Sequence, residues 1–294
     1  MFEEIIQKCI LQVRRQCSFF GSLMLFAEIE ISKQIPTAAT DGRKIYFNEE
    51  FLNDVLNEFP NLSKKQNSDS YVNQNEIKFA NNLYSDFSKN IKLLFDFLNS
   101  NYFVGFLQKI TNINEKLIID EKLNGGGLHE IKKGGLLKIH SDFNRHPILN
   151  LDRRLNVLVY LNKDWNEDYG GHLQLWDKEM QKCEKKILPI FNRMVVFSTT
   201  DYSNHGHPDP LNCPDKRSRK SVATYYYSDG RPSNEVDKMY IKNTTYFKNR
   251  VGHHNETFQN DTSFKRFLRS LSFYKKIKEF EKKFLRFRLF KKKK

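Results

Sequence analysis

Three residues of this chain could together hold a metal ion. His140 and Asp142 are two positions apart in LLKIHSDFN, and residues i and i+2 of a β-strand project from the same face. His205 follows the strand-like run RMVVFSTT (residues 193–200) and could supply a third ligand. Two imidazoles and one carboxylate form the facial triad of non-heme Fe(II) oxygenases, which leaves coordination positions open for a co-substrate and dioxygen.

A candidate anion clamp follows in RSRKSVATYYYS (residues 217–228), where Arg219 and Ser221 share one face of an expected strand. The planar guanidinium of arginine matches a carboxylate bidentately, and a neighbouring hydroxyl can add a third hydrogen bond. A dicarboxylate such as 2-oxoglutarate could chelate iron through its 2-oxo acid end while Arg219 holds the distal carboxylate.

From about residue 124 to residue 230, the chain resembles the 2-oxoglutarate and Fe(II)-dependent oxygenases of the prolyl 4-hydroxylase type. The stretches that carry the resemblance are GGGLHEIKKGGLLKIHSDFN (125–144), RRLNVLVYLNKDW (153–165), YGGHLQLW (169–176), HGHPDP (205–210) and RKSVATYYYS (219–228). The resemblance implies a mainly β catalytic core, folded as a double-stranded β-helix or jelly roll.

The resemblance also implies a set of site residues and cofactors. It implies iron ligation by His140, Asp142 and His205, and contacts to 2-oxoglutarate from Arg219, Tyr160 and Ser221. The cofactors implied are Fe(II), 2-oxoglutarate and O2, with ascorbate as reductant. Succinate and carbon dioxide would be released as the substrate is hydroxylated.

Two positions depart from the pattern, and one ligand has an alternative. Where animal-type prolyl hydroxylases have tyrosines nine and three residues before the first iron ligand, this chain has Ile131 and Leu137. The pocket beside the co-substrate is therefore expected to differ. His207 lies two residues past His205 and is an alternative ligand, although the His-Gly-x-Pro order of the resemblance favours His205.

We expect one barrel domain with further segments on either side, because 294 residues leave room for one such domain plus additions. The expected divisions are an N-terminal segment (1–60), a polar linker (61–76), helical support of two or three helices (77–120), the barrel (121–232), a connecting region (233–260) and a basic amphipathic tail (261–294).

Residues 17–51 resemble the N-terminal part of a family of von Willebrand-type metallopeptidases, notably in FFGSL and IPTAATDGRKIYFNEEF. The H-E-x-x-H motif, in which two histidines one helical turn apart bind zinc, is absent. The segment is interpreted as a fused remnant or as a β-hairpin that turns at Asp41 and Gly42. No protease activity is expected.

The net charge of +14 belongs mostly to the tail, since residues 261–294 carry 14 Lys or Arg and 3 Asp or Glu. Apolar residues recur there at helical steps: Phe264, Phe267, Leu271, Tyr274, Ile277, Phe280, Phe284 and Phe287. A basic amphipathic helix of this kind can lie on an anionic membrane or bind an acidic partner. Packing on the barrel is the plain alternative, and nucleic-acid binding is a third.

The cysteines, Cys9, Cys17, Cys183 and Cys213, form neither a short metal spacing nor a disulfide framework. A reducing cytoplasm, with peripheral membrane contact through the tail, is the expected location. A peptide or protein carrying proline is the expected substrate. A small metabolite, a membrane-associated glycan, or a non-catalytic barrel that acts as a scaffold are the alternatives.

Overall fold

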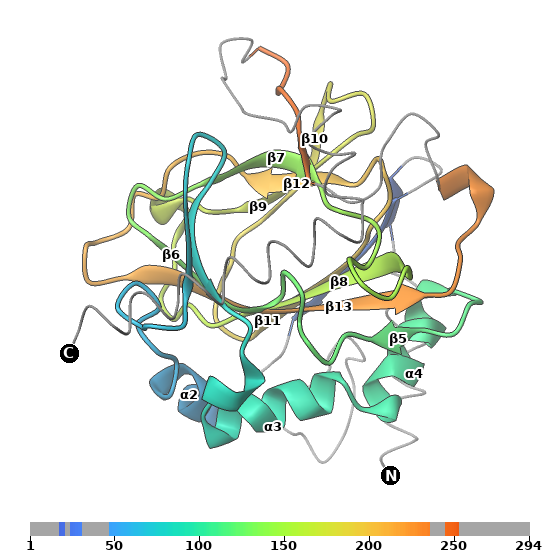
Figure 1. The fold of residues 1–294 in the computed structure, drawn as a ribbon. Coiled ribbons are helices and arrows are strands. Elements are labelled where there is room, and N and C mark those ends of the chain that lie inside the picture. The colour runs from blue at the N-terminus through green and yellow to red at the C-terminus, as the bar shows by residue number, and fades with distance from the viewer. Residues whose placement is uncertain (1–17, 21–23, 31–46, 236–244, 253–294) are drawn as a thin grey trace, which may run out of the picture.

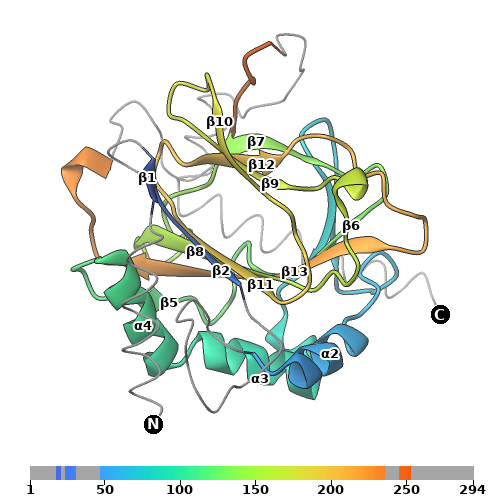
Figure 2. The same ribbon diagram turned by 180° about the vertical axis from the view of Figure 1, so that it is seen from behind.

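The computed structural model describes residues 18–20, 24–30, 47–235 and 245–252. Two β-sheets lie face to face, and a layer of helices covers the outer side of the larger sheet (Figure 1). The same layers are seen from behind in Figure 2. Stacked sheets of this kind bury the side chains of their facing surfaces.

The larger sheet has the strand order β1-β2-β11-β8-β13-β6-β4-β3, with β5 paired to β13. Its strands are β1 (Ser18–Phe20), β2 (Met24–Glu30), β3 (Asp69–Val72), β4 (Ile77–Asn81), β5 (Ile118–Ile119), β6 (Gly127–Lys132), β8 (Asp152–Tyr160), β11 (Arg193–Ser198) and β13 (Ser218–Ser228). All the pairings in this sheet are antiparallel.

The smaller sheet has the order β10-β9-β12-β7-β14. Its strands are β7 (Leu137–Ser141), β9 (Leu173–Trp176), β10 (Cys183–Ile187), β12 (Asn204–His207) and β14 (Tyr246–Phe247). Between β6 and β13 the chain passes repeatedly from one sheet to the other, which gives the ladders β6-β13-β8-β11 and β7-β12-β9-β10. This is the double-stranded β-helix predicted from the sequence.

Among the described residues, three helices form the outer layer: α2 (Glu49–Asn57), α3 (Lys89–Leu98) and α4 (Asn101–Thr111). Short 3-10 helices lie at Tyr84–Asp86, Glu167–Tyr169 and Ser233–Glu235. Helix α3 buries Ile91, Leu94, Phe95 and Leu98, the helical steps of a core-facing stripe. Helix α4 begins after Ser100, whose hydroxyl accepts from the backbone N–H of Phe103.

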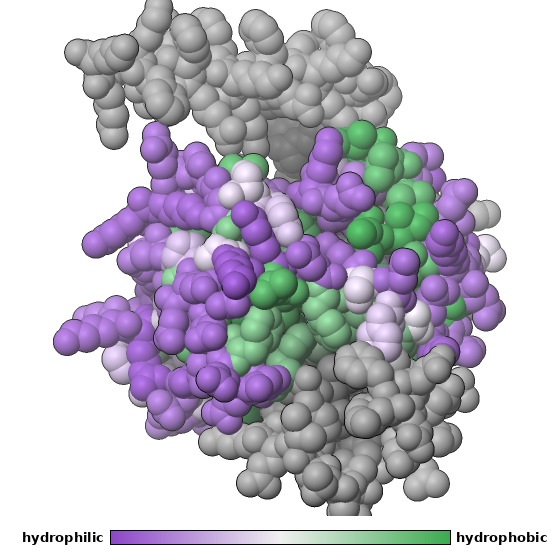
Figure 3. Space-filling model, turned by 90° about the horizontal axis from the view of Figure 1, so that it is seen from below, coloured by the Kyte–Doolittle hydropathy of each residue, from purple (hydrophilic) through white to green (hydrophobic). Residues whose placement is uncertain are grey.

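The helices pack on the outward face of the larger sheet. Leu155, Val157 and Val159 alternate along β8 and join the buried side chains of the helices in the main hydrophobic cluster. Seen from below, the face that carries this layer shows apolar side chains gathered among hydrophilic ones (Figure 3). The helices therefore stiffen the sheet from one side and leave its other face to the interior of the barrel.

Two sequence-based assignments need correction. The expected linker, residues 61–76, contains β3, whose side chains are mostly exposed and whose stability comes from backbone pairing with β4. The expected helical support begins with a strand, β4, before helices α3 and α4. The hydropathy pattern does not reveal β3, because an edge strand can pair through its backbone without apolar side chains.

The ends of the chain are described only in part. In the N-terminal segment, β1 pairs with β2 and β2 pairs with β11, so part of it joins the larger sheet. The turn expected at Asp41 and Gly42 and the tail of residues 261–294 lie outside the described residues. In the part of the chain that the structure describes, no helix is long and apolar enough to cross a membrane.

Candidate functional site

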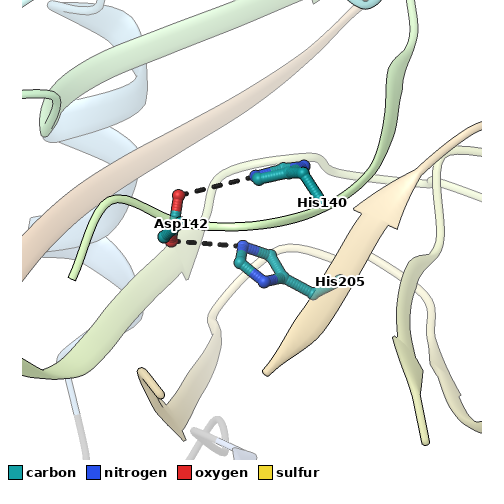
Figure 4. Close-up of side chains that lie close together, drawn as sticks. All are labelled: His140, Asp142 and His205. Carbon is teal, nitrogen blue, oxygen red and sulfur yellow. Dashed lines mark ion pairs between the residues drawn. The ribbon is translucent and has the colours of Figure 1, made fainter. Parts of the chain in front are cut away.

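The smaller sheet brings the three candidate metal ligands together. His140 on β7 and His205 on β12 are direct partners in the antiparallel register, and Asp142 lies just beyond the end of β7. The ligand atoms of the three side chains lie within 4.8 Å of one another. Figure 4 shows both imidazole rings on one side of the Asp142 carboxylate, each facing one of its two oxygens.

The hydrogen bonds of the two rings point their free nitrogens at this carboxylate. The Nδ1 atoms of His140 and His205 lie 2.7 and 2.9 Å from the carbonyl oxygens of Lys138 and Ser203. A carbonyl oxygen only accepts, so each Nδ1 carries the hydrogen and each Nε2 keeps its lone pair. Both Nε2 atoms face Asp142, at 3.5 Å for His140 and 3.3 Å for His205.

This arrangement fits a divalent cation. Two nitrogen lone pairs and a carboxylate are all electron donors, so only a positive charge between them makes the cluster favourable. Burial lowers the pKa of His140, and neighbouring His205 lowers it further, which favours the neutral, ligating form of the ring. Two histidine nitrogens and one carboxylate oxygen are the protein donors typical of non-heme iron sites.

Arg153, which the sequence pattern did not single out, holds the carboxylate of Asp142 in place. Arg153 is fully buried, and its guanidinium donates to Asp142 over 2.9 Å. The amide of Asn156 donates to the same carboxylate oxygen over 2.8 Å. Burial alone would raise the pKa of the Asp142 carboxyl, but the charge of Arg153 and the interactions with His205 and His140 outweigh it and hold that pKa well below its usual range.

Regular alternation along a strand would not place Arg153 beside Asn156. Residues 153 and 156 differ by three, which would place them on opposite faces of a regular strand. A register shift in the pairing of β8 with β13, between Tyr226 and Tyr227, brings both side chains to Asp142. The guanidinium of Arg153 also stacks on Tyr225, with its central carbon 3.4 Å from the ring centroid.

The expected anion clamp lies on the inner face of the larger sheet. Arg219 is 4% exposed and donates to the carbonyl of Gly171 over 2.9 Å and to the hydroxyl of Tyr160 over 3.2 Å. Ser221 is the register partner of Tyr160. The three side chains predicted to hold 2-oxoglutarate are thus neighbours.

Gly171 explains the glycine pair of YGGHLQLW. Its φ is +73°, and an added Cβ would lie 2.6 Å from Leu211 and 3.1 Å from the Cδ of Arg219. Only glycine suits this backbone conformation and this close approach. The pair therefore does more than turn the chain, because it leaves space for the arginine.

A cavity of about 190 Å³ opens beside His140 and Asp142. Aromatic side chains contribute to its wall: Tyr71, Phe143, Tyr225 and Phe247. The hairpin β3–β4 and strand β14 supply two of these aromatics, so segments distant in sequence form the wall of this cavity, here called the entrance cavity. Phe247 lies against His140, with the ring centroids 5.4 Å apart and the rings tilted.

The remaining histidines near the site differ in their surroundings. His129 lines the entrance cavity, and burial, with the charge of Lys78, lowers its pKa to about 3. His207 is buried on β12 but is not a member of the metal-binding cluster. His146 and His172 pair instead with Asp120 and Glu167.

Comparisons with known proteins agree with this geometry. Residues 126–227 match the model of the 2OG-Fe(II) oxygenase superfamily. Over 79 residues, 26% of this chain, the sequence is 29% identical to prolyl 3-hydroxylase OGFOD1 of Mus musculus. The chain spans only 14% of that relative's length.

A solved structure shares the fold, and a second gives a lower score. A Pseudomonas putida prolyl-4-hydroxylase superposes with a TM-score of 0.50 at 12% identity, covering 75% of this chain and 100% of that one. A Trichoplax adhaerens prolyl hydroxylase, solved with a peptide fragment of hypoxia inducible factor, gives a TM-score of 0.48 at 18% identity, with coverages of 78% and 90%. Residues 126–227 are therefore similar to the 2OG-Fe(II) oxygenase superfamily, and they lie on a double-stranded β-helix fold.

Proposed function

We propose that this protein is an Fe(II)- and 2-oxoglutarate-dependent dioxygenase that hydroxylates a prolyl residue of a peptide or protein. In the overall reaction, 2-oxoglutarate, O2 and a C–H bond of the substrate give succinate, CO2 and the hydroxylated product. The observation that carries the proposal is the cluster of His140, Asp142 and His205, whose free donor atoms suit iron.

The residues of the chain have separate parts in this proposal. His140, Asp142 and His205 hold iron, while Arg153 and Asn156 keep the carboxylate oriented. Iron(II), when bound, supplies open coordination positions and the oxidising chemistry with dioxygen. The barrel interior excludes bulk water from the reacting groups.

Arg219 binds the distal carboxylate of 2-oxoglutarate in this proposal, and Tyr160 and Ser221 line the same place. The guanidinium is buried, and the described residues give it no carboxylate partner. A buried charge is costly unless an opposite charge accompanies it. A dicarboxylate that enters the barrel would supply that charge.

The wall of the entrance supports a peptide substrate. Four aromatic rings surround the approach to His140 and Asp142, and aromatic surfaces bind the rigid ring and extended backbone of proline-containing segments. The relatives named above are prolyl hydroxylases, which supports the same substrate class. Ascorbate is proposed as the reductant that keeps iron in the ferrous state.

The location and further partners are also proposals. Cys183 and Cys213 are free thiols, which supports a reducing compartment such as the cytoplasm. The charge and apolar period of residues 261–294 support contact with an anionic membrane or an acidic partner. The barrel would then work close to that surface.

The test is formation of succinate from 2-oxoglutarate by anaerobically purified protein, given Fe(II), ascorbate and air. We expect His140→Ala and Asp142→Ala to abolish it and His172→Ala, a histidine outside the metal cluster, to retain it. Proline-containing peptides should then increase turnover and gain the mass of one oxygen atom. Folded, iron-loaded protein that neither binds 2-oxoglutarate nor forms succinate would contradict the proposal and favour a non-catalytic scaffold.

A further inference from the structure

His207 is a buried histidine whose ring has no described partner. Its side chain lies on β12, two residues past His205, and the residue is 3% exposed. Neither ring nitrogen has a hydrogen-bond partner among the described residues. His140 and His205 each have one nitrogen against a backbone carbonyl, so His207 differs from its neighbours on the same sheet.

A buried imidazole ring without hydrogen-bond partners is energetically unfavourable. In either neutral tautomer the ring has one N–H donor and one acceptor, and a buried polar group without a partner costs roughly 1–3 kcal/mol. Such groups in native proteins usually have a bound partner or a function. The ring is also outside the metal-binding cluster, so iron is not that partner.

Burial lowers the pKa of His207, and among charged groups the guanidinium of Arg219 lowers it most. His207 and Gly171 line the same cavity, of about 380 Å³, and the carbonyl of Gly171 accepts a hydrogen bond from Arg219. A histidine without a partner therefore lies near an arginine without a carboxylate. One anionic group could satisfy both.

The register partners of His207 and Arg219 are both apolar. The register partner of His207 on β7 is Leu137, and that of Arg219 on β6 is Ile131. Both are apolar, so a carboxylate bound by Arg219 finds no hydrogen-bond donor in either side chain. His207 therefore adds a polar group from the smaller sheet to Tyr160 and Ser221 of the larger sheet.

We propose that His207 donates a hydrogen bond to the carboxylate that Arg219 binds, the distal carboxylate of 2-oxoglutarate. The inference rests on the proposed function, since it requires that co-substrate. It makes His207 a residue that selects a dicarboxylate over a shorter 2-oxo acid. A histidine that only filled space would contribute equally to the binding of both.

The test compares two ligands that share the metal-chelating end. 2-Oxoglutarate has the distal carboxylate, and pyruvate lacks it. Their affinities for the full chain loaded with Mn(II) are measured anaerobically by calorimetry, so turnover is not involved. We expect His207→Phe to weaken 2-oxoglutarate binding roughly tenfold or more, the effect of a lost hydrogen bond to a charged group, and to leave pyruvate binding unchanged.

The controls separate the outcomes. His207→Gln keeps a donor and should recover part of the affinity for 2-oxoglutarate. His146→Gln changes a buried histidine that pairs with Asp120 and does not line this cavity, and should leave both affinities unchanged. If His207→Phe does not fold, His207→Met, whose flexible chain adapts to the space, carries the same comparison.

Equal weakening of both ligands, or no weakening of either, would overturn the role of His207. In both cases wild-type binding of 2-oxoglutarate would leave the proposed function standing. A wild-type protein that binds Mn(II) but not 2-oxoglutarate would overturn the proposed function itself, together with the inference that rests on it.

Discussion

Arg153 holds the carboxylate of the candidate metal site in place. Its guanidinium contacts Asp142 and Asn156 and is enclosed by the rings of Tyr225 and Phe143. An arginine in this position provides positive charge when no metal is bound and orientation when a metal is bound. The two contributions can be separated by experiment.

We expect Arg153→Met to destabilise the metal-free protein by about 3 kcal/mol or more, because it leaves the carboxylate of Asp142 without its cationic partner. Bound Mn(II) supplies positive charge and should reduce this loss. Urea denaturation with EDTA and with Mn(II) measures both values. The matched control is Arg154→Met, because Arg154 pairs with Glu115, so its effect should not depend on metal. An equal loss for Arg153→Met with and without metal would contradict this account.

The Glu115–Arg154 pair makes stability depend on pH. Burial acts to raise the pKa of Glu115, but the hydrogen bond and charge of Arg154 outweigh it, so the pKa lies below its ordinary value. A lowered pKa in the folded state stabilises the protein above the unfolded-state pKa and stops doing so as the pH falls through the folded-state value.

Glu115→Gln should therefore lower the melting temperature at neutral pH. The difference from the wild type should shrink as the pH falls below the ordinary glutamate range, about 4.3. The effect is modest because Glu115 is partly exposed. Thermal scans between neutral and acidic pH measure it, and a difference that stays constant over this range would exclude the ion pair as its cause.

At the scale of elements, β14 completes the smaller sheet beside a candidate ligand. Its two residues pair with Ser141 and His140, the amide of Lys248 donates to the carbonyl of Ile139, and Arg250 pairs with Asp209 at 2.9 Å. So short a strand cannot hold itself by backbone pairing alone. The ring of Phe247, 7% exposed, is its main apolar anchor.

Phe247→Ala should release β14 from the sheet. Losing a buried phenylalanine costs roughly 3 kcal/mol, so the amide of Lys248 should exchange with solvent about a hundredfold faster. Hydrogen exchange measured by NMR would show this, and Phe247→Leu should give a smaller change. Unaltered protection of the Lys248 amide would mean that the ring does not anchor the strand.

The sequence predicted the barrel strands well because their residue patterns match their environment. The alternation of Leu155, Val157 and Val159 directs one face of β8 to the helices, and the His-x-Asp spacing on β7 needs only a strand. The hairpin β3–β4 and strand β14 were not predicted. Both depend on pairing with distant strands, and their own side chains show little periodic pattern.

The candidate site was predicted to a similar degree. The sequence identified the cluster of His140, Asp142 and His205 and the neighbourhood of Arg219. It did not identify Arg153, because a register shift overrides simple alternation, nor Phe247, because no local spacing connects it with His140. Roles that come from tertiary pairing are invisible to a local pattern.

At the scale of the molecule, charge is distributed unevenly. Residues 261–294 carry +11 of the net +14, so the remaining chain is nearly neutral. Binding of the protein to anionic surfaces should therefore depend on the tail, while metal and 2-oxoglutarate binding should depend on the barrel.

Deleting residues 262–294 should abolish co-flotation with vesicles that contain phosphatidylserine and leave 2-oxoglutarate binding intact. Neutral vesicles are the control, since each Lys or Arg of the tail adds about 1 kcal/mol of binding only near anionic lipid. Failure of the intact chain to float, or equal flotation of the shortened chain, would contradict a membrane role for the tail.

The pairing of β7 with β12 and β14 also sets an order of events during synthesis. The chain leaves the ribosome from its N-terminus, so His140 and Asp142 emerge before His205, and Phe247 emerges later still. Until β12 arrives, a nascent chain carries only two of the three ligands of the proposed iron site. Under the proposed function, a chain interrupted before β12 would therefore be released without a complete iron site.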